Sequence, residues 1–379
     1  MADIPAPAPP FRPVGLLNRL IAAPRFQAFC AAVPGLRSLA RREGVALFDL
    51  MQGFVQSQML MALVELRVLH MLADGPMSAD ALAPHCDVPP ERMQILLQAG
   101  AAMKLLRRKG AQFHLARRGA AFLAVPGLAD MVRHHDVLYA DLADPVAFLR
   151  GQTQPGLAQF WPYVFGAKGA VDSEQTARYS RLMAESQHLV AQEALAHLSL
   201  KGARRLMDVG GGTGVFLRAV RARYPALELA LFDLPDVVAQ AALPADIARH
   251  GGSFRDDPLP EGADVISLVR VLYDHSDATV RALLTRAYAA LPAGGRLLII
   301  EPMSGGAQPD PQTDVYFSVY TLAMQTGQTR SSARITELLS EAGFAEISTE
   351  QGHRRFVTSV LQARKPQGPH LSDKSVNKS

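Results

Sequence analysis

A short run of glycines constrains the fold of this chain more than any other part of its sequence. The run L-M-D-V-G-G-G-T-G spans residues 206–214, and a second apolar run, L-E-L-A-L-F-D, ends at Asp233. The pattern predicts a strand, a tight turn whose glycines let the backbone approach a ligand, a helix capped by Thr213, and a second strand that ends on an acid. An acid in that place can accept hydrogen bonds from the hydroxyls of a ribose. The segment therefore predicts half of a nucleotide-binding site.

The spacing of the glycines disfavours a dinucleotide as the ligand. Glycines stand at 210, 211, 212 and 214, whereas the G-x-G-x-x-G fingerprint would need a further one at Val215 or Leu217. Asp208, just before the turn, would repel a pyrophosphate but attract a cationic group. The amino group of S-adenosylmethionine is one example of such a cation.

Two later motifs give the chain its resemblance to a known family. Residues 270–277, R-V-L-Y-D-H-S-D, are similar to R-V-L-H-D-W-x-D, and residues 291–301, L-P-A-G-G-R-L-L-I-I-E, are similar to L-x-P-G-G-x-L-x-I-x-E. Over residues 53–365 the chain resembles the class I, S-adenosylmethionine-dependent O-methyltransferases that carry a winged-helix-like dimerisation domain. Among bacterial members it is most similar to those that act on carotenoids. The resemblance implies an α/β fold: a mostly parallel, Rossmann-like sheet with an antiparallel terminal strand pair, preceded by an all-helical, winged-helix dimerisation domain.

The resemblance also implies which residues hold S-adenosylmethionine. Asp208, Gly210 and Gly212 would face its amino acid end. Asp233 would accept hydrogen bonds from both ribose hydroxyls, and Leu234 would lie against the adenine edge.

Three further positions complete this predicted cofactor site. Ser253 stands in place of the acid that usually meets the adenine amine, and Phe254 supplies a stacking face. Arg270 occupies a basic position near the carboxylate of the cofactor, or it pairs with a neighbouring acid.

The predicted catalytic residues depart from the family pattern. The family uses a histidine base flanked by two carboxylates; here the histidine is replaced by Tyr273, one acid is kept as Glu301, and the other is missing near Thr329. A tyrosine with its ordinary pKa of about 10 is a poor base at neutral pH, although it can orient a substrate oxygen. His275 is either a proton acceptor or a capping residue at the start of the helix from Asp277. The candidate catalytic residues are therefore Tyr273, His275 and Glu301.

These departures bear on the substrate. Loss of the histidine base disfavours a phenol-specific enzyme, whereas for an alcohol that cannot be ionised beforehand the placement of the reactants dominates. Residues 315–324 form an apolar segment that aligns with the substrate helix of the family. We therefore expect methylation of a hydroxyl of an acyclic carotenoid, a hydrophobic small molecule. The alternatives are an O-methyltransferase of a polyketide, phenazine or phenolic metabolite, and a winged-helix regulator that senses S-adenosylmethionine.

The pattern along the chain predicts five segments. They are a basic amphipathic arm (1–50), a winged-helix-like dimerisation domain (51–125), bridging helices (126–200), a methyltransferase domain (201–365) and a disordered tail (366–379). In the methyltransferase domain we expect strands at 206–209, 227–233, 264–271 and 296–301, helices at 214–223, 277–291 and 333–342, and an antiparallel pair at 344–349 and 356–363.

The predicted arm has an unusual charge pattern. No acid occurs between Ile4 and Arg42, whereas six arginines do, and Pro24 and Pro34 divide the segment into short helices. A basic amphipathic stretch can lie on an anionic membrane surface. The alternative is an arm packed on a partner subunit with its arginines solvated.

The predicted winged helix has two interpretations. It contains a basic wing, made of Arg107, Arg108, Lys109, Arg117 and Arg118, that a regulator would use to bind DNA. In the family that the chain resembles, the same module is a dimer interface, and the apolar stripe Met59, Leu63, Leu66 and Leu69 suggests a surface that needs a cover. We therefore expect a homodimer and no nucleic-acid partner.

Composition limits the remaining possibilities. The sequence contains no apolar run of the ~18 residues that cross a bilayer and no signal-peptide pattern. Its cysteines are Cys30 and Cys86, and no Cys/His spacing suggests a metal site. We expect a cytoplasmic protein, with the arm as a means of peripheral attachment to the membrane surface.

Overall fold

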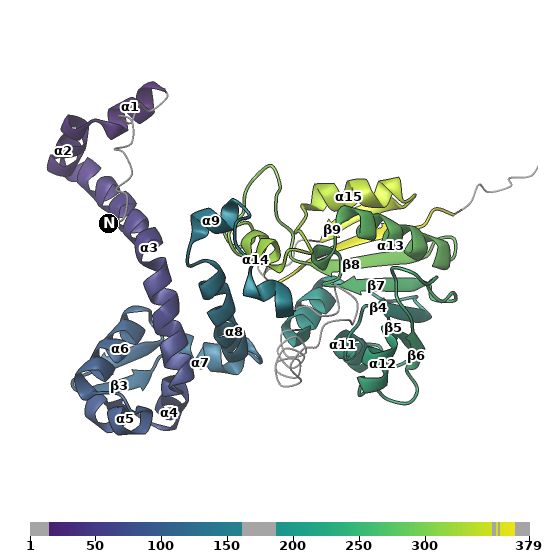
Figure 1. Ribbon diagram of the computed structural model, residues 1–379, viewed down its shortest axis with the longest axis horizontal. Coiled ribbons are helices and arrows are strands. Elements are labelled where there is room, and N and C mark those ends of the chain that lie inside the picture. The colour runs from purple at the N-terminus through teal and green to yellow at the C-terminus, as the bar shows by residue number, and fades with distance from the viewer. Residues whose placement is uncertain (1–14, 161–186, 351–353, 355–356, 368–379) are drawn as a thin grey trace, which may run out of the picture. The chain divides into compact units, whose positions relative to one another are not determined.

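A computed structural model of the chain describes residues 15–160, 187–350, 354 and 357–367 (Figure 1). The described residues form two compact units, one that ends at Ala120 and one that begins at Ala121. Residues 1–14 of the predicted arm, 161–186 of the predicted bridging segment and 368–379 of the predicted tail lie outside this description. None of the described helices combines the length and the apolarity needed to cross a bilayer.

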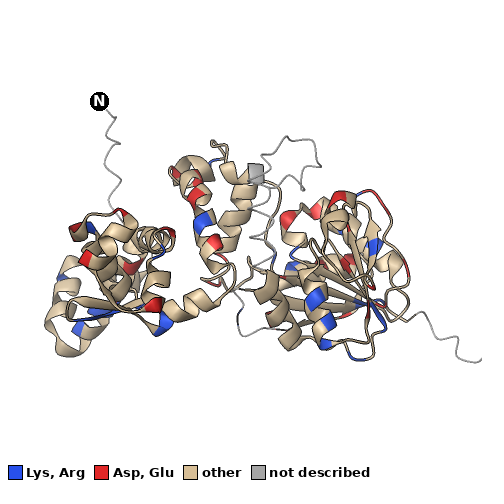
Figure 2. Cartoon of the chain, turned by 90° about the horizontal axis from the view of Figure 1, so that it is seen from below, with Lys and Arg blue, Asp and Glu red and all other residues tan. Residues whose placement is uncertain are grey.

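The first unit has the winged-helix fold that its sequence predicts. Its helices are α3 (Pro34–Glu65), α4 (Val68–Asp74), α5 (Ala79–Cys86) and α6 (Pro90–Ala102). They accompany a three-stranded antiparallel sheet in the order β1 (Met77–Ser78), β3 (Gln112–Leu115), β2 (Leu106–Lys109). The Ser78 hydroxyl accepts a hydrogen bond from the Ala81 amide at 3.2 Å and so caps α5. Arg107, Arg108 and Lys109 lie on β2, among the blue residues of Figure 2. Helix α7 (Arg117–Ala124) follows the sheet.

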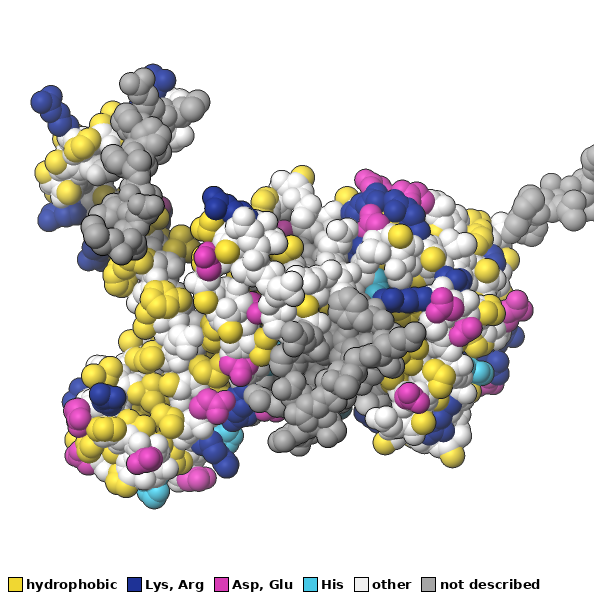
Figure 3. All heavy atoms as spheres, in the orientation of Figure 1, with side chains coloured by type: hydrophobic (Ala, Val, Ile, Leu, Met, Phe, Trp, Pro, Cys, Tyr) yellow, Lys and Arg dark blue, Asp and Glu magenta, His cyan; other side chains and the backbone are white. Residues whose placement is uncertain are grey.

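Two of the four residues of the apolar stripe are internal and Met59 and Leu66 are half-buried, which weakens the reason given above for a dimer. Leu63 and Leu69 are at most 1% exposed, because α6 packs on α3 and β3 packs on α4. A run of exposed apolar residues lies further upstream on α3, within 45–55, and is seen as a yellow band in Figure 3. Leu50 is 80% and Phe54 70% exposed. The surface that needs a cover is therefore this part of α3.

Prolines set the helix starts in the arm. Helix α1 (Leu16–Ala22) is followed by α2 (Pro24–Ala32) and α3, and each of the last two has its proline at the first helical position. Proline suits that position because its missing N–H would have no partner there. Helix α3 continues without a break past residue 50, so the predicted arm and winged helix share one helix.

The second unit is built on a seven-stranded sheet. The strand order is β6 (Ala248–Gly251), β5 (Glu228–Asp233), β4 (Arg205–Val209), β7 (Val265–Val269), β8 (Arg296–Glu301), β10 (Ser359–Arg364), β9 (Ala345–Glu350). All neighbours run parallel except β10, which is antiparallel to β8 and β9. This is the predicted mostly parallel sheet with an antiparallel terminal pair. The sequence analysis did not predict β6, whose four residues are all exposed and so lack an apolar pattern.

Helices bury both faces of this sheet. Helices α13 (Asp277–Ala290) and α15 (Ser332–Glu341) cover one face through Leu284 and Leu338. Helix α11 (Val215–Arg223) and the helix at 187–197 cover the other, through Leu217 and Ala194. Alternate strand residues enter the two cores, as the pleat requires. A short helix, α12 (Pro235–Gln240), follows β5.

A smaller helical cluster completes the second unit. It contains α8 (Leu128–Asp141), α9 (Pro145–Leu149), the 3₁₀ helix η1 (Gly156–Phe160) and α14 (Tyr316–Met324). Leu138, Phe148, Leu157 and Met324 form its apolar centre. Helix α14 also packs against η2 (Leu272–Asp274), the turn that follows β7.

Candidate active site

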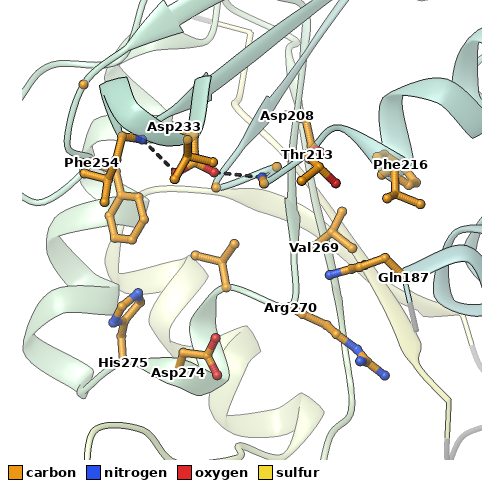
Figure 4. A pocket seen from close by; sticks show the side chains of 18 of the residues that line it. Gln187, Asp208, Thr213, Phe216, Asp233, Phe254, Val269, Arg270, Asp274 and His275 are labelled. Atoms are coloured by element: carbon orange, nitrogen blue, oxygen red, sulfur yellow. Dashed lines mark hydrogen bonds between the residues drawn. The ribbon is translucent and has the colours of Figure 1, made fainter. Parts of the chain in front are cut away.

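A cavity of about 350 Å³ opens at the carboxyl ends of β4, β5 and β7 (Figure 4). Parallel sheets bind ligands at this edge because the loops that leave the strands converge there. The lining residues come from the glycine turn and the strand that ends at Asp233, from the 270–277 motif, and from other segments such as the helix of Gln187. Those named below are Gln187, Asp208, Gly210, Gly212, Phe216, Asp233, Leu234, Phe254, Arg255, Arg270, Tyr273, Asp274 and His275.

The glycine turn leaves space on the cavity side. Gly210 and Gly212 adopt left-handed φ values of 70° and 57°, which favour glycine. A Cβ on Gly212 would meet no atom within 4 Å, so the backbone here borders open space. Helix α11 begins after Gly214, which serves as its N-cap without a side-chain hydrogen bond. The prediction that Thr213 caps this helix is therefore wrong.

Asp233 is held at the end of β5 by one backbone amide on each carboxylate oxygen. Its Oδ2 accepts a hydrogen bond from the Gly212 amide at 2.8 Å, and its Oδ1 accepts one from the Leu234 amide at 2.7 Å (Figure 4). Each carboxylate oxygen can accept two hydrogen bonds. Asp233 therefore retains an acceptor position on each oxygen for the two hydroxyls of a ribose, and Leu234 lines the cavity beside it.

Asp208 is a buried carboxyl with one unsatisfied oxygen. The Ser267 hydroxyl donates to Oδ1 at 2.6 Å, while Oδ2 has no hydrogen-bond partner among the described residues. Burial raises the pKa of Asp208 to about 7, opposed by the Ser267 hydrogen bond. A cation bound in the cavity would favour the ionised form. The site therefore fits the cationic amino group of S-adenosylmethionine.

Two aromatic side chains, Phe254 and His275, form one wall of the cavity. Phe254 meets the His275 ring edge-on, with 5.2 Å between ring centroids. The Arg255 guanidinium contacts His275 Nδ1 at 3.2 Å. Ser253 is not one of the lining residues, because its hydroxyl donates to Asp256 and accepts from the Arg255 amide. Phe254 therefore lines the cavity and Ser253 does not, while the predicted adenine contacts of both residues remain predictions.

Arg270 lines the cavity from the loop after β7. It has a left-handed φ of 56°, and its guanidinium points away from Asp233 in Figure 4. Its Nη2 donates to the Val357 carbonyl at 3.4 Å, and its charge lowers the pKa of Asp274 against the effect of burial. Both predicted roles of Arg270, beside the carboxylate of the cofactor and beside a neighbouring acid, remain predictions.

Glu301 holds the η2 turn and does not reach the cavity. Its Oε2 accepts from the Leu272 and Tyr273 amides at 3.0 and 3.3 Å, and its Oε1 has no hydrogen-bond partner among the described residues. Burial raises its pKa to about 7, partly opposed by the charge of Arg330. Glu301 therefore acts on Tyr273 through the backbone and is a positioning residue.

Comparison with known proteins decides the family of this chain. The O-methyltransferase domain matches residues 139–345, and the O-methyltransferase dimerisation domain matches residues 48–124. The chain is 61% identical over 357 residues to demethylspheroidene O-methyltransferase of Cereibacter sphaeroides, a match that covers 92% of this chain and 94% of that protein. The chain belongs to the O-methyltransferase family.

Two more members of the O-methyltransferase family extend the comparison. Demethylspheroidene O-methyltransferase of Rhodobacter capsulatus is 51% identical over 361 residues, 95% of this chain and 92% of that protein. The structure of human N-acetylserotonin methyltransferase in complex with S-adenosylmethionine matches with a TM-score of 0.71 and 26% identity, covering 86% of this chain and 98% of that chain. S-adenosylmethionine is the methyl donor of the family, as predicted, and the dimerisation domain supports the predicted homodimer.

Tyr273 and His275, the two candidates for a catalytic base in this O-methyltransferase, both have pKa values shifted so that the charged form is disfavoured. Burial raises the pKa of Tyr273 well above its ordinary value, so its hydroxyl is neutral. Burial, and then the charges of Arg255 and Arg330, lower the pKa of His275 to about 4. His275 is therefore a weak base, and its contact with Phe254 places it on the aromatic wall.

The second acid of the family pattern is replaced by a group of hydroxyls. Ser304 hydrogen-bonds to both Thr329 and Ser318, at 2.9 Å in the latter case, and Ser318 lies 3.3 Å from Thr329. These groups satisfy one another. They take the place of a carboxylate without supplying a charge.

Several site residues were missed by sequence reasoning. Asp274 lines the cavity, and burial followed by the charge of Glu301 raises its pKa well above the ordinary value. Arg330 donates to the Leu272 and His275 carbonyls at 2.8 and 2.7 Å and so fixes the ends of the turn. Gln187 and Phe216 line the cavity from two helices. Of these residues, only Asp274 could have been proposed from the sequence, because it lies within the 270–277 motif.

Proposed function

We propose that this chain transfers a methyl group from S-adenosylmethionine to a hydroxyl of an acyclic carotenoid. The observation that carries the proposal is the 61% identity, over 92% of the chain, to an enzyme named for demethylspheroidene. The absence of a histidine at position 273 agrees with it, since a carotenoid alcohol is too weak an acid for a histidine to ionise beforehand. The hydroxyls of Ser304, Ser318 and Thr329, which carry no charge and bond to one another, agree with an uncharged acceptor.

The residues of the site act mainly by placement. When bound, S-adenosylmethionine supplies a methyl group activated by the positive charge on its sulfur. Asp208 binds the amino group of the cofactor, and Asp233 binds its ribose hydroxyls. Tyr273 lines the cavity where the family places its base. Holding the acceptor oxygen in line with the methyl carbon and sulfur can contribute several kcal/mol, roughly 7–11 at most. This chain therefore needs precise positioning more than a strong base.

A comparison of two classes of methyl acceptor tests the proposal. The purified chain is incubated with labelled S-adenosylmethionine and either demethylspheroidene or a phenol such as N-acetylserotonin. We expect kcat/KM for the carotenoid alcohol to exceed that for the phenol by about a hundredfold, a ratio that binding differences can supply. Faster methylation of the phenol would contradict the carotenoid assignment. Absence of transfer to either acceptor, together with a tight DNA complex, would favour the regulator.

We further propose that the arm contacts an anionic lipid surface. Between residues 15 and 42 the structure describes five arginines and no acid, while Leu16 and Leu17 are 86% and 68% exposed. A two-fold contact between two such arms would bring like charges together. Anionic lipids instead attract each arginine by about 1 kcal/mol near the surface.

Vesicle sedimentation tests the arm. We expect the dimer to bind phosphatidylcholine vesicles that contain phosphatidylglycerol, and not pure phosphatidylcholine, with binding lost at high salt. The triple variant Arg37→Gln, Arg41→Gln, Arg42→Gln should bind weakly. Equal sedimentation of the variant and the parent chain would refute the role of these arginines.

A further inference from the structure

The ring of His275 is held between two other side chains of the cavity wall. Its Nδ1 lies 3.2 Å from Arg255 Nη2, and its ring meets that of Phe254 with centroids 5.2 Å apart and an interplanar angle of 68°. All three residues line the cavity, and His275 is only 8% exposed. These contacts fix the orientation of the imidazole ring.

The contact with Arg255 decides which ring nitrogen of His275 carries a proton. An arginine side chain has N–H donors and no acceptor, so Arg255 donates and His275 Nδ1 accepts. Burial, and then the charges of Arg255 and Arg330, lower the pKa of His275 to about 4, so the ring is neutral at pH 7 and has one N–H. That N–H is therefore on Nε2, and no acceptor for it is found among the residues that the structure describes.

The backbone of His275 is also held on both sides. Its amide donates to the Leu272 carbonyl at 3.1 Å, and its carbonyl accepts from Arg330 Nη2 at 2.7 Å. Arg330 is 2% exposed and pairs with Asp277 at the start of α13. A donor held in this way has little conformational freedom left to lose when a ligand binds, so little of the binding free energy goes into ordering it.

The order of side chains along the cavity indicates which part of S-adenosylmethionine reaches His275. In Figure 4, Asp208 and Gln187 lie on one side of Asp233, and Phe254 and His275 lie on the other. With the amino group at Asp208 and the ribose at Asp233, as proposed above, the adenine is left for the side of Phe254 and His275. The exocyclic amine of adenine is a donor, whereas its ring nitrogens are acceptors. Only a ring nitrogen can therefore accept from His275 Nε2.

We propose that His275 Nε2 donates a hydrogen bond to a ring nitrogen of the adenine of S-adenosylmethionine, and that Arg255 is a positioning residue that holds His275 in the required tautomer. His275 is then a cofactor-binding residue and not the base that acts on the acceptor. The family motif has a tryptophan at this position, which has no second ring nitrogen for Arg255 to hold. The contact serves the methyl donor, whichever acceptor the chain methylates.

Titration calorimetry with S-adenosylhomocysteine and its deaza analogues tests the hydrogen bond. The 1-deaza, 3-deaza and 7-deaza analogues each replace one adenine nitrogen by C–H, which cannot accept. We expect at least one of them to bind the parent chain about tenfold more weakly, a difference of about 1.4 kcal/mol, because it leaves the buried N–H unsatisfied. His275→Phe keeps an aromatic ring but has no N–H. It should bind S-adenosylhomocysteine about tenfold more weakly than the parent and no longer discriminate against that analogue.

His250→Phe supplies the control, because His250 is exposed on β6 and lies outside the cavity. It should bind each of these ligands as the parent chain does, and thermal unfolding should show both variants to be folded. The hydrogen bond is refuted if the parent chain binds all the analogues as tightly as S-adenosylhomocysteine. It is also refuted if every loss seen with an analogue persists in folded His275→Phe, since the loss then comes from another contact.

NMR of the chain labelled with ¹⁵N-histidine tests the tautomer. The signals of His275 are those missing from His275→Phe, and at pH 8 the ring is neutral even at the ordinary histidine pKa of about 6.5. We expect a proton on Nε2 and none on Nδ1 in the parent chain, and both tautomers in ligand-free Arg255→Met. A proton on Nδ1 in the parent chain would overturn the proposed donor. An Arg255→Met spectrum identical to that of the parent would overturn the positioning role of Arg255.

Discussion

Asp233 offers the most direct test of the cofactor half site. Its two oxygens accept from the Gly212 and Leu234 amides, which leaves one acceptor position on each for a ribose hydroxyl. Truncation to alanine removes a charged acceptor from both hydroxyls, and losing hydrogen bonds to a charged group costs about 1.5–3 kcal/mol. Since about 1.4 kcal/mol is a tenfold change in affinity, Asp233→Ala should weaken binding by about 10-fold to 150-fold.

Titration calorimetry with S-adenosylhomocysteine measures this loss without turnover, because the product carries the same ribose. Asp246→Ala is the control: it also removes an aspartate carboxylate, but Asp246 pairs with Arg221 and lies outside the cavity. The control should bind as the parent does. Thermal unfolding of both variants separates a local loss from misfolding. A Kd for folded Asp233→Ala within twofold of the parent would refute the ribose assignment.

Three further predictions follow from the site and the dimerisation domain. Burial raises the pKa of Asp208 to about 7, so below that pH the carboxyl must lose its proton before it can bind a cationic amino group. The affinity for S-adenosylmethionine should therefore rise from pH 5.5 to about 7. Calorimetry on Asp208→Asn should find this pH dependence lost. Tyr273→Phe and His275→Ala should each lower kcat by only about tenfold to a hundredfold, and a thousandfold loss with intact cofactor affinity would identify a dedicated base. Phe54→Glu should shift the chain from dimer to monomer in equilibrium sedimentation, since Phe54 is 70% exposed within the dimerisation domain; a dimer that persists would place the interface elsewhere.

Local sequence patterns were sufficient for the frame of the molecule. Buried parallel strands are continuous apolar runs, so 206–209 and 296–301 agree with β4 and β8 to within one residue. Prolines and Ser78 set helix starts through the backbone of their own segments. The glycine turn and Asp233 were predictable for the same reason. A ligand that binds the backbone at the end of a strand contacts residues that are adjacent in sequence, so a short motif is enough to predict the site. Strand β6 was missed because an exposed edge strand need not carry an apolar pattern.

The roles of individual polar side chains were decided by tertiary structure. Glu301 matches the family acid in sequence, yet its carboxylate turns to the amides of Leu272 and Tyr273, a choice set by how β8 packs beside β7. Ser253 satisfies its hydroxyl within its own turn and leaves the wall to Phe254 and Arg255.

The hydrogen-bonded pairs His134–Tyr320 and His135–Tyr316, between α8 and α14, join residues more than 180 positions apart. No local period of the sequence encodes such a contact, because it depends on which faces of α8 and α14 the fold brings together. The sequence by itself therefore predicted the glycine turn and the acid that form the candidate cofactor half site, since that site is made of consecutive backbone and strand ends. Only the packing of distant helices and strands decided which acids, histidines and tyrosines reach the cavity and which serve to hold it.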